Sequence, residues 1–562
     1  MTAFETIASQ MRKALYMLPD QTLEWTIDVP ESGPILEFGN AVLLDRQPIT
    51  FEVEVATASE STILHTHTAS AASSWNDVRL DLSRWARQRI GLRLKATGGS
   101  GNVALWSNPL LSSTPKERLN VIVLLEDALR ADYLSAYGYQ RETSPNKTAL
   151  MRERGVQFEW AVSQATTTRP SVPSLMTSLY PTATGVWHFS DMLSERYLTL
   201  AEILRAQGFV TASFIQNGNA GPFAGMHQGF SELYDRQILG QETEEIYGER
   251  VFSWIERYRD RNFFLYLHTI DPHGPYQPPP PFDDWYQEVA GEVSAVTWDS
   301  KFEPESITAP TAEGRRQRYA DEIRHNDALL PRLLDKLSSL GLAESTLLVL
   351  LADHGEYMGE HGWWGHHPPG LMPVIRVPLM IIYPKRFLEP KRIDAPVQLI
   401  DVMPTVLEVA QVDPTDLLLQ GDSLVPLIEG REIDRWRDRV VISEEPTAML
   451  KHQPCRCASA IHRDWHLVSS AALWPGRGRR LFPNVLPLVN TRVYRFREDP
   501  TEQNPLLSAL PDLYVRWLAA DMFSKLQTAN MITQQRLTEG EDVEVRQDPD
   551  TLEHLRGLGY LN

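Results

Sequence analysis

The segment Val121-Ile-Val-Leu-Leu125, followed at once by Glu126-Asp127, indicates the fold class of this chain. Three similar apolar runs occur at residues 263–267, 346–351 and 379–383. A short continuous apolar run is typical of a strand buried on both faces, and such strands form mostly parallel sheets covered by helices. The pattern predicts an α/β domain over residues 114–444, with a mostly parallel central sheet sandwiched by helices.

Polar side chains follow these apolar runs. Asp127 follows the first, and Asp353 and His354 follow residues 346–351. Because ligands bind at the carboxyl ends of strands in such sheets, we expect these side chains to gather at one edge. Carboxylates placed together repel unless a cation lies between them. We therefore expect one divalent metal ion, with Zn²⁺ or Mn²⁺ favoured by the Asp and His mixture and Ca²⁺ or Mg²⁺ as alternatives.

A run of hydroxyl residues and prolines, Thr166-Thr-Thr168-Arg-Pro170-Ser-Val-Pro173, predicts the start of a helix. Proline fits the first helical turn, where no backbone N–H is needed. Thr168 then lies at a helix N-terminus, which offers free N–H groups and a partial positive charge to an anion. Its hydroxyl is either a helix cap or a nucleophile for a phosphate or sulfate ester.

The regions that flank the α/β domain differ from it in their pattern of apolar and polar residues. Apolar and polar residues alternate at 49–55, 77–82 and 90–94, which predicts a β-sandwich over residues 1–113. Phe4, Ile7, Met11 and Leu15 predict a short amphipathic helix ahead of it. A proline-rich segment from Pro278 to about Pro310 predicts a long surface excursion. Residues 445–562 are predicted to form a small C-terminal α+β subdomain, with a helix near residues 512–525.

Composition limits the classes of partner. The formal net charge is -19, which argues against non-specific binding to nucleic acid or to anionic membranes. No apolar stretch reaches transmembrane length, and the first residues lack the apolar core of a signal peptide. We expect a cytoplasmic protein, or an exported one if this sequence is a trimmed form. The two cysteines, Cys455 and Cys457, are read as incidental, and the sequence leaves the oligomeric state open.

Several motifs appear in the order seen in the sulfatase branch of the alkaline phosphatase superfamily, which the chain resembles from Asn120 to about Gly430. The segment from Asn120 to Tyr139 resembles that family's first metal-binding strand. Asp271-Pro-His273-Gly-Pro-Tyr276 resembles its substrate-anion histidine loop. The further matches are Asp353-His354-Gly355-Glu356 with Gly359-Glu-His361-Gly362, then Arg376-Val-Pro378, Asp401-Val-Met-Pro404 and the terminal Leu555-Arg-Gly-Leu-Gly-Tyr-Leu561.

The departures from that branch concern the nucleophile. Sulfatases carry Cys (or Ser)-x-Pro-Ser-Arg, whose first residue becomes formylglycine, whereas this chain has Thr168-Arg-Pro-Ser171-Val172. Threonine carries a methyl group on Cβ and cannot give the aldehyde. The segment instead resembles the Thr-x-x-Ser-Val-Pro of phosphoethanolamine transferases. The resemblance implies an unmodified Thr168 nucleophile that shares the metal ion with Asp127, Asp353 and His354.

Three histidines are candidates for contact with the substrate. His273 and His366 are expected to bind the non-bridging oxygens or to protonate the leaving group, a task that suits a side chain titrating near pH 7. His366 also stands where sulfatases often have a lysine after Trp364-Gly365. His361 is a substrate-binding residue, a metal ligand or a loop anchor. Glu126 is either a further ligand or a neighbour that faces the other way.

These observations predict a metal-dependent hydrolase, or a related transferase, that cleaves phosphate or phosphonate esters through a covalent threonine intermediate. The substrate is expected to be a small-molecule, glycan-linked or lipid-linked anionic ester. A sulfuric ester hydrolase is one alternative. A carbohydrate-binding protein with an inactive catalytic domain is the other. A second metal ion is not expected, because Asp271-Pro-His273 lacks the wider spacing that resembles a two-metal site.

Overall fold

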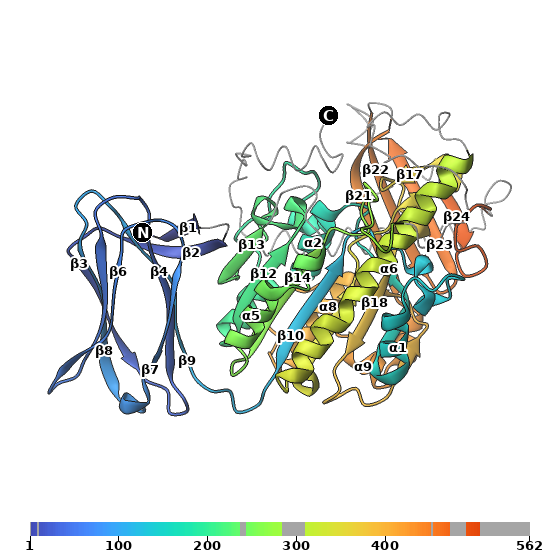
Figure 1. The fold of residues 1–562 in the computed structure, drawn as a ribbon. Coiled ribbons are helices and arrows are strands. Elements are labelled where there is room, and N and C mark those ends of the chain that lie inside the picture. The colour runs from blue at the N-terminus through green and yellow to red at the C-terminus, as the bar shows by residue number, and fades with distance from the viewer. Residues whose placement is uncertain are drawn as a thin grey trace, which may run out of the picture.

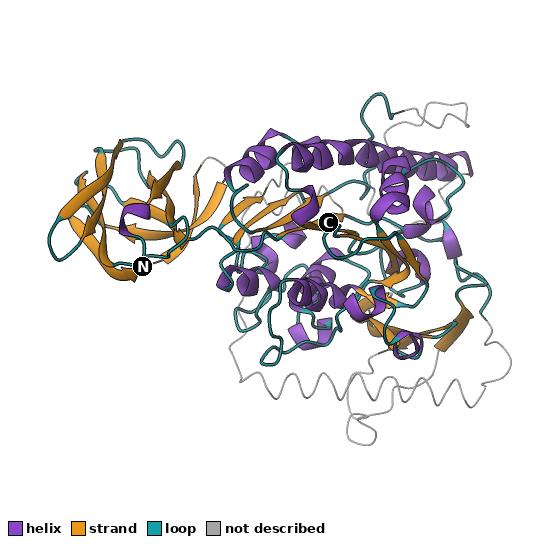
Figure 2. Ribbon diagram, turned by 90° about the horizontal axis from the view of Figure 1, so that it is seen from below, coloured by secondary structure: helices purple, strands orange, loops and turns teal. Residues whose placement is uncertain are grey.

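The computed structural model describes residues 2–7, 10–235, 243–283, 309–450, 453–472 and 491–505. The predicted helix near residues 512–525, the terminal motif 555–561 and most of the predicted surface excursion lie outside these residues. None of the described helices is long and apolar enough to span a membrane. Figures 1 and 2 show a strand-rich N-terminal unit beside a larger unit of mixed helices and strands.

The N-terminal unit is a sandwich of two antiparallel sheets. Its strands are β1 (Thr2–Ile7), β2 (Gln10–Met17), β3 (Gln21–Asp28), β4 (Ile35–Val42), β5 (Ile49–Ala56), β6 (Ser61–Ala69), β7 (Asn76–Asp81), β8 (Arg89–Gly98) and β9 (Ala104–Ser112). One sheet has the order β3-β8-β5-β6, and the other contains β2-β9-β4-β7. The two sheets pack around Phe38, Phe51 and Trp106, and the Trp106 ring contacts the rings of both phenylalanines.

The predicted leading helix is wrong. Residues 2–7 and 10–17 form the strands β1 and β2, which pair with each other in an antiparallel hairpin. β2 also pairs with β9 on the sandwich side and with β13 on the other side. Tertiary strand pairing therefore overrides the helical spacing of Phe4, Ile7, Met11 and Leu15. Within β2 the buried side chains are those of Arg12, Ala14 and Met17.

The central sheet of the larger unit is mostly parallel, as predicted. Its main strands are β10 (Asn120–Glu126), β11 (Val156–Val162), β12 (Val210–Ile215), β13 (Glu232–Asp235), β14 (Phe263–Thr269), β15 (Thr346–Leu351) and β18 (Arg376–Ile382). β10 lies between β14 and β15 and is parallel to both, whereas β18 is antiparallel to β15. Short strands are β16 (Tyr357–Met358), β17 (Trp364–Gly365), β19 (Lys391–Ile393) and β20 (Val397–Gln398). Every residue of β10, β14 and β15 is buried, which explains their continuous apolar sequence.

Helices cover this sheet and form the predicted sandwich of layers (Figure 1). They are α1 (Pro145–Arg154), α2 (Thr168–Thr177), α3 (Pro181–Thr184), α4 (Leu200–Ala206), α5 (Glu249–Arg257), α6 (Ala309–Ser339), α7 (Met372–Ile375), α8 (Val402–Val409), α9 (Val425–Ile428) and α10 (Ile433–Arg437). A separate antiparallel sheet follows, with β21 (Val440–Leu450), β22 (Gln453–His462), β23 (Trp465–Ala472) and β24 (Thr491–Arg495).

The central sheet does not stop at the edge of the larger unit. β13 pairs with β2, where Glu232 is opposite Arg12, and the sheet continues through β9, β4 and β7. One 14-stranded sheet therefore runs from the larger unit into the sandwich.

Candidate active site

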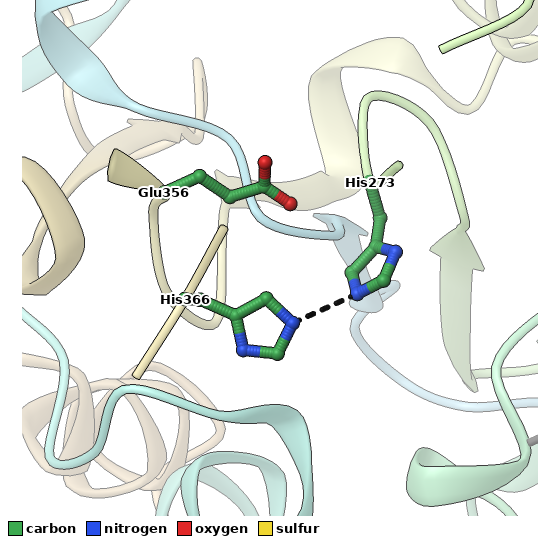
Figure 3. Close-up of side chains that lie close together, drawn as sticks. All are labelled: His273, Glu356 and His366. Carbon is green, nitrogen blue, oxygen red and sulfur yellow. Dashed lines mark hydrogen bonds between the residues drawn. The ribbon is translucent and has the colours of Figure 1, made fainter. Parts of the chain in front are cut away.

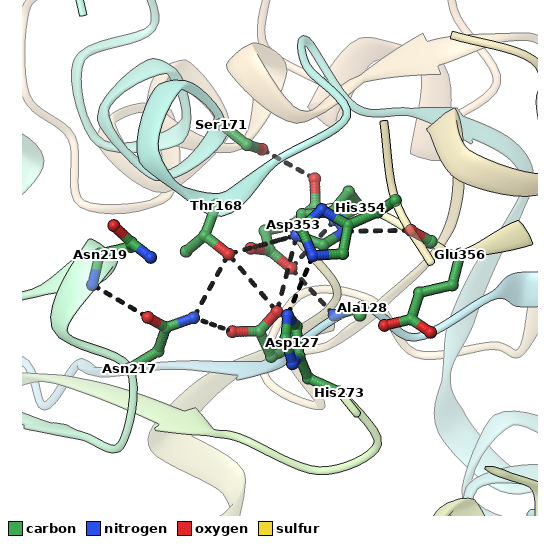
Figure 4. Close-up of polar contacts among 12 residues, drawn as sticks. Asp127, Ala128, Thr168, Ser171, Asn217, Asn219, His273, Asp353, His354 and Glu356 are labelled. Carbon is green, nitrogen blue, oxygen red and sulfur yellow. Dashed lines mark hydrogen bonds and ion pairs between the residues drawn. The ribbon is translucent and has the colours of Figure 1, made fainter. Parts of the chain in front are cut away.

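Four side chains predicted to share a metal ion meet at the carboxyl ends of the parallel strands. Asp127 directly follows β10, and Asp353 and His354 follow β15. Thr168 is the first residue of α2, which follows β11, a strand separated from β15 by β18. All four side chains are fully buried. Figure 4 shows them pointing toward one another from these separate elements.

The Thr168 hydroxyl faces this cluster rather than its own helix. Its Oγ1 lies 3.2 Å from His354 Nε2 and 3.4 Å from Asp127 Oδ1. The helix cap position belongs to Thr167, which makes no side-chain capping hydrogen bond. Between a cap and a nucleophile, the geometry of Thr168 therefore fits the nucleophile.

The two carboxylates of the cluster are held differently. Asp127 Oδ2 accepts hydrogen bonds from Asn217 Nδ2 at 2.5 Å and lies 3.1 Å from His268 Nε2. Asp353 Oδ1 accepts from the backbone N–H groups of Ala128 at 3.2 Å and of His354 at 3.0 Å. Asp353 Oδ2 is buried without a hydrogen-bond partner in the described part of the chain.

The electrostatics of the pair indicate a missing positive charge. Burial and the neighbouring Asp127 charge raise the pKa of Asp353. Burial also opposes the charged form of Asp127, but its histidine neighbours outweigh this effect and hold its pKa below the usual value. Burial lowers the pKa of His354. Among the described residues, no arginine or lysine lies within ion-pair distance of either carboxylate.

Donor chemistry and spacing at this point suit a divalent cation. One ligand atom each from Asp127, His268 and Asp353 lie within 4.8 Å of one another. A bound cation would give the unpartnered Asp353 Oδ2 a partner and would balance the charge of the two buried carboxylates. Two of the predicted ligands, Asp127 and Asp353, belong to this group, whose third member is His268. His354 Nε2 lies 3.6 Å from Asp127 Oδ1 and 3.5 Å from Asp353 Oδ2, and its role and that of Thr168 as ligands stay predictions.

The local sequence explains why Thr168 is held in place. Ser171 Oγ, on the first turn of α2, donates to the Asp353 backbone carbonyl at 2.8 Å. Arg169 Nη1 donates to the backbone carbonyls of Asp191 and Phe223, each at 2.7 Å. These contacts tie the start of α2 to β15 on one side and to loops on the other. The hydroxyl and arginine residues around Thr168 therefore position the helix N-terminus.

A second group lies beside the first and consists of His273, Glu356 and His366 (Figure 3). His273 Nε2 is 3.0 Å from His366 Nε2. The His366 ring also lies 4.3 Å, between centroids, from that of His354. Glu356 accepts a hydrogen bond from the Tyr276 hydroxyl, and its Oε1 is buried without a hydrogen-bond partner among the described residues. The structure thus brings His273 and His366 together beside the group formed by Asp127, Thr168, Asp353 and His354.

The two undecided residues have separate surroundings. Glu126 Oε1 lies 2.9 Å from Lys147 Nζ, and Lys147 is also 3.7 Å from Asp327. Glu126 therefore belongs to a buried ion pair on the side facing α1 and α6. His361 has a positive φ of 55° and its ring contacts that of Trp363. In the described part of the chain, His361 is in neither group of potential metal ligands.

Sequence reasoning missed Asn217 and did not assign roles to His268 and Glu356. Asn217 Nδ2 contacts both Asp127 and Thr168, the latter at 3.4 Å. The same signal that found Asp127 applies to Asn217, because it follows the buried strand β12. Its strand contains Thr211 and Ser213, which weakened the apolar run that would have marked it.

Comparison with known proteins identifies the family. The model of the family described as Sulfatase matches residues 119–412, more than half of the chain. The arylsulfatase of Clostridium perfringens is 25% identical over 390 residues, which cover 57% of this chain and 80% of that protein. Phosphoethanolamine transferase EptA of Salmonella typhimurium is 26% identical over 337 residues, which cover 58% of this chain and 56% of the transferase.

Solved structures agree on the fold. The phosphonate monoester hydrolase of Agrobacterium radiobacter is 20% identical and has a TM-score of 0.59, with 76% of this chain and 100% of that chain covered. A structure of BT4656, in complex with D-glucosamine-2-N,6-O-disulfate as its substrate, has a TM-score of 0.58 at 18% identity. Together with the family match, these likenesses show that the chain belongs to the sulfatase family, within the alkaline phosphatase superfamily of ester-acting enzymes.

Proposed function

We propose that this sulfatase-family enzyme cleaves phosphate or phosphonate esters through a covalent intermediate on Thr168. The observation that carries the proposal is the position of Thr168 Oγ1, 3.2 Å from His354 and 3.4 Å from Asp127 at a buried pair of carboxylates. The similarity to both phosphoethanolamine transferases and a phosphonate monoester hydrolase supports this choice of ester.

We assign one divalent metal ion to Asp127, Thr168, Asp353 and His354. When bound there, the ion supplies positive charge that favours loss of the Thr168 hydroxyl proton and stabilises negative oxygens. His268 and Asn217 hold Asp127 through its Oδ2. The two backbone N–H groups on Asp353 Oδ1 fix the second carboxylate. These contacts keep both carboxylates in place for the ion.

The first chemical step belongs to Thr168. Its deprotonated Oγ1 attacks phosphorus in line, so that a bond from Oγ1 to phosphorus forms while the bond from phosphorus to the ester oxygen breaks. The N-terminus of α2 contributes backbone N–H groups and its dipole to the negative oxygens that develop. The leaving oxygen takes a proton as it departs.

We assign the donation of that proton to His273. His273 Nδ1 lies 2.7 Å from the Gly274 carbonyl, and His366 Nδ1 lies 3.2 Å from the Thr166 carbonyl, so both Nδ1 atoms carry hydrogen. A hydrogen bond between the two Nε2 atoms then requires a further proton. Burial and the neighbouring imidazoles hold the pKa of His366 well below its usual value, which disfavours a charged His366. We therefore propose His273 as the general acid, with His366 orienting it.

Release of the phosphothreonine completes the cycle. Water, or an acceptor alcohol, gives its proton to His273, which lost one in the first step, and attacks phosphorus. The bond from phosphorus to Thr168 Oγ1 breaks, and Oγ1 leaves in the deprotonated form in which the cycle began. A phosphoryl ester opens by this route with the same side chains. A sulfatase instead expels sulfate when its aldehyde hydrate collapses, and threonine cannot form that hydrate. This difference is the reason to rank phosphoryl esters above sulfate esters for this chain.

A panel of aryl phosphate monoesters and diesters, aryl phosphonates and aryl sulfates tests the proposal. The protein should turn over at least one phosphorus ester, and intact-mass analysis with a slow phosphonate should show an adduct located by peptide sequencing on Thr168. Robust sulfatase activity without any phosphoesterase activity would establish the sulfuric ester alternative. The absence of all activity in the metal-loaded protein would favour a binding protein.

A further inference from the structure

A cavity of about 390 Å³ lies where the sandwich meets α4 of the catalytic unit. Its wall is built from both sheets of the sandwich, and aliphatic side chains predominate, among them Leu15 on β2, Ile27 on β3 and Leu111 on β9. Its volume falls in the range of about 300–1,000 Å³ that is typical of small-molecule pockets. We call this cavity the interdomain pocket.

The interdomain pocket exposes apolar surface to solvent. Trp25, on the edge strand β3, is 39% exposed although its side chain lines the cavity. Leu15, Ile27 and Leu111 are only half-buried, whereas the strands of the sandwich centre bury their inward side chains completely. The two sheets thus leave an open apolar slot at this edge. Trp25 thus presents apolar surface that a ligand in the pocket would remove from water.

Two cations stand at this apolar cavity. Lys13 extends from β2 and Arg205 from the last turn of α4, and both line the pocket. Among the described residues, neither makes an ion pair. The neutral polar residue Asn108 already donates its Nδ2 hydrogen to the Ser231 carbonyl. The charge of Glu202 acts on Arg205, but no carboxylate is among the residues that line the pocket, so the charges that line it are both positive.

The pocket is separate from the catalytic centre. Arg205 lies just before β12 and lines a neighbouring cavity together with Val210, the first residue of that strand. Asn217, which contacts Asp127 and Thr168, follows the other end of β12. A strand of six residues spans about 20 Å. A ligand of modest size in the pocket therefore does not reach Thr168.

We propose that the interdomain pocket binds a single-chain amphiphile, with its alkyl chain in the slot and its monoanionic head group on Lys13 and Arg205. Aliphatic walls fit an alkyl chain better than a sugar, because a sugar needs several polar partners and the pocket has few. This site does not depend on the proposed chemistry at Thr168.

Isothermal titration calorimetry with octanoate, below the concentration at which it forms micelles, tests the proposal. Octanoate is not an ester, so the catalytic site cannot consume it. Octanoate should bind with one site per chain, and decanoate should bind about tenfold more tightly, since each buried methylene adds about 0.8 kcal/mol. Neutral 1-octanol should bind at least tenfold more weakly than octanoate.

The double variant Lys13→Ala, Arg205→Ala should weaken octanoate binding at least tenfold. Arg84→Ala, which removes an exposed cation elsewhere on the sandwich, is the matched control and should bind as the wild type does. Thr168→Ala should also bind octanoate normally, which separates this site from the catalytic one. Unchanged binding in the double variant would overturn the proposal. Tighter binding of octyl glucoside than of octanoate would also overturn it, in favour of a sugar site.

Discussion

Two groups of charged side chains in this molecule, one around the buried pair Arg12 and Glu232 and one around the buried Asp127 and Asp353, differ in how their charges are balanced. The interdomain network contains Arg12, Asp77, Glu232 and Arg257, in which two arginines face two carboxylates. The catalytic cluster contains Asp127 and Asp353 without an arginine or lysine at ion-pair distance among the described residues. Buried charges persist when they are paired. We therefore interpret the balanced network as structural, and the unbalanced cluster is where we propose a bound cation.

The pKa directions agree with this contrast. Burial raises the pKa of Asp77, but the hydrogen bonds and charges of Arg12 and Arg257 outweigh it and hold the pKa below the usual value. Asp353 has no such partner, and its pKa is raised by burial and by Asp127. The network thus stabilises the charged form of Asp77. The catalytic cluster without a metal ion destabilises the charged form of Asp353.

The largest effect is expected at Thr168. Thr168→Ala should lower turnover of the best phosphorus ester by about 10³-fold or more, because it removes the nucleophile. Steady-state kinetics measure the loss, and circular dichroism checks that the fold is kept. Thr168→Ser, which retains the hydroxyl, is the control and should keep substantial activity. Equal activity of the alanine variant and the wild type would remove Thr168 from the mechanism.

The next effect is on stability, in the balanced network. Arg12→Met should lower the free energy of unfolding by about 3 kcal/mol, because it leaves the buried Glu232 carboxylate without that partner. The loss should be the same with and without metal. Chemical denaturation measures it, with Arg84→Met as the control. The Arg84 pair with Glu60 is exposed and should change stability by less than about 1 kcal/mol.

Removing a charge from the unbalanced cluster should raise the stability of the metal-free protein, whereas removing one from the balanced network lowers it. Because the pKa of Asp353 in the folded state is raised, its contribution to stability is present at low pH and is lost as the pH rises above the ordinary value of about 4. Asp353→Asn should therefore stabilise the metal-free protein at pH 8, by about 1–3 kcal/mol. Asp77→Asn should destabilise it under the same conditions. If both asparagine variants were destabilised in the chelator-treated protein, the contrast between the regions would fail.

The smallest effect is expected at Glu126, which directly precedes the proposed metal ligand Asp127 in the sequence. Its carboxylate pairs with Lys147, so Glu126→Gln should keep one bound metal ion and change turnover less than about threefold. A modest stability loss of about 1–3 kcal/mol should accompany it, because Lys147 loses a charged partner. Metal analysis of the purified variant checks the result. Loss of the ion would make Glu126 a ligand after all.

The sequence predicted the central sheet and the edge at which the site forms, because fully buried strands carry long apolar runs and end in polar residues. Asp127, Asp353 and His354 were found in this way, and Thr168 was found from the prolines that start α2. Asn217 was not predicted because Thr211 and Ser213 interrupt the apolar sequence of β12. The β1–β2 hairpin was not predicted because β2 pairs with β9 and β13, which are distant in the sequence.

Native mass spectrometry of the intact chain tests most directly whether the unbalanced cluster is a cation site. The wild type, loaded with Zn²⁺ or Mn²⁺ and freed of excess metal, should carry one ion. Asp353→Asn should carry none, and Arg12→Met, measured under conditions where it is folded, should carry one as the wild type does. A wild-type chain that retains no ion, or an Asp353→Asn chain that retains it with undiminished affinity, would contradict the account.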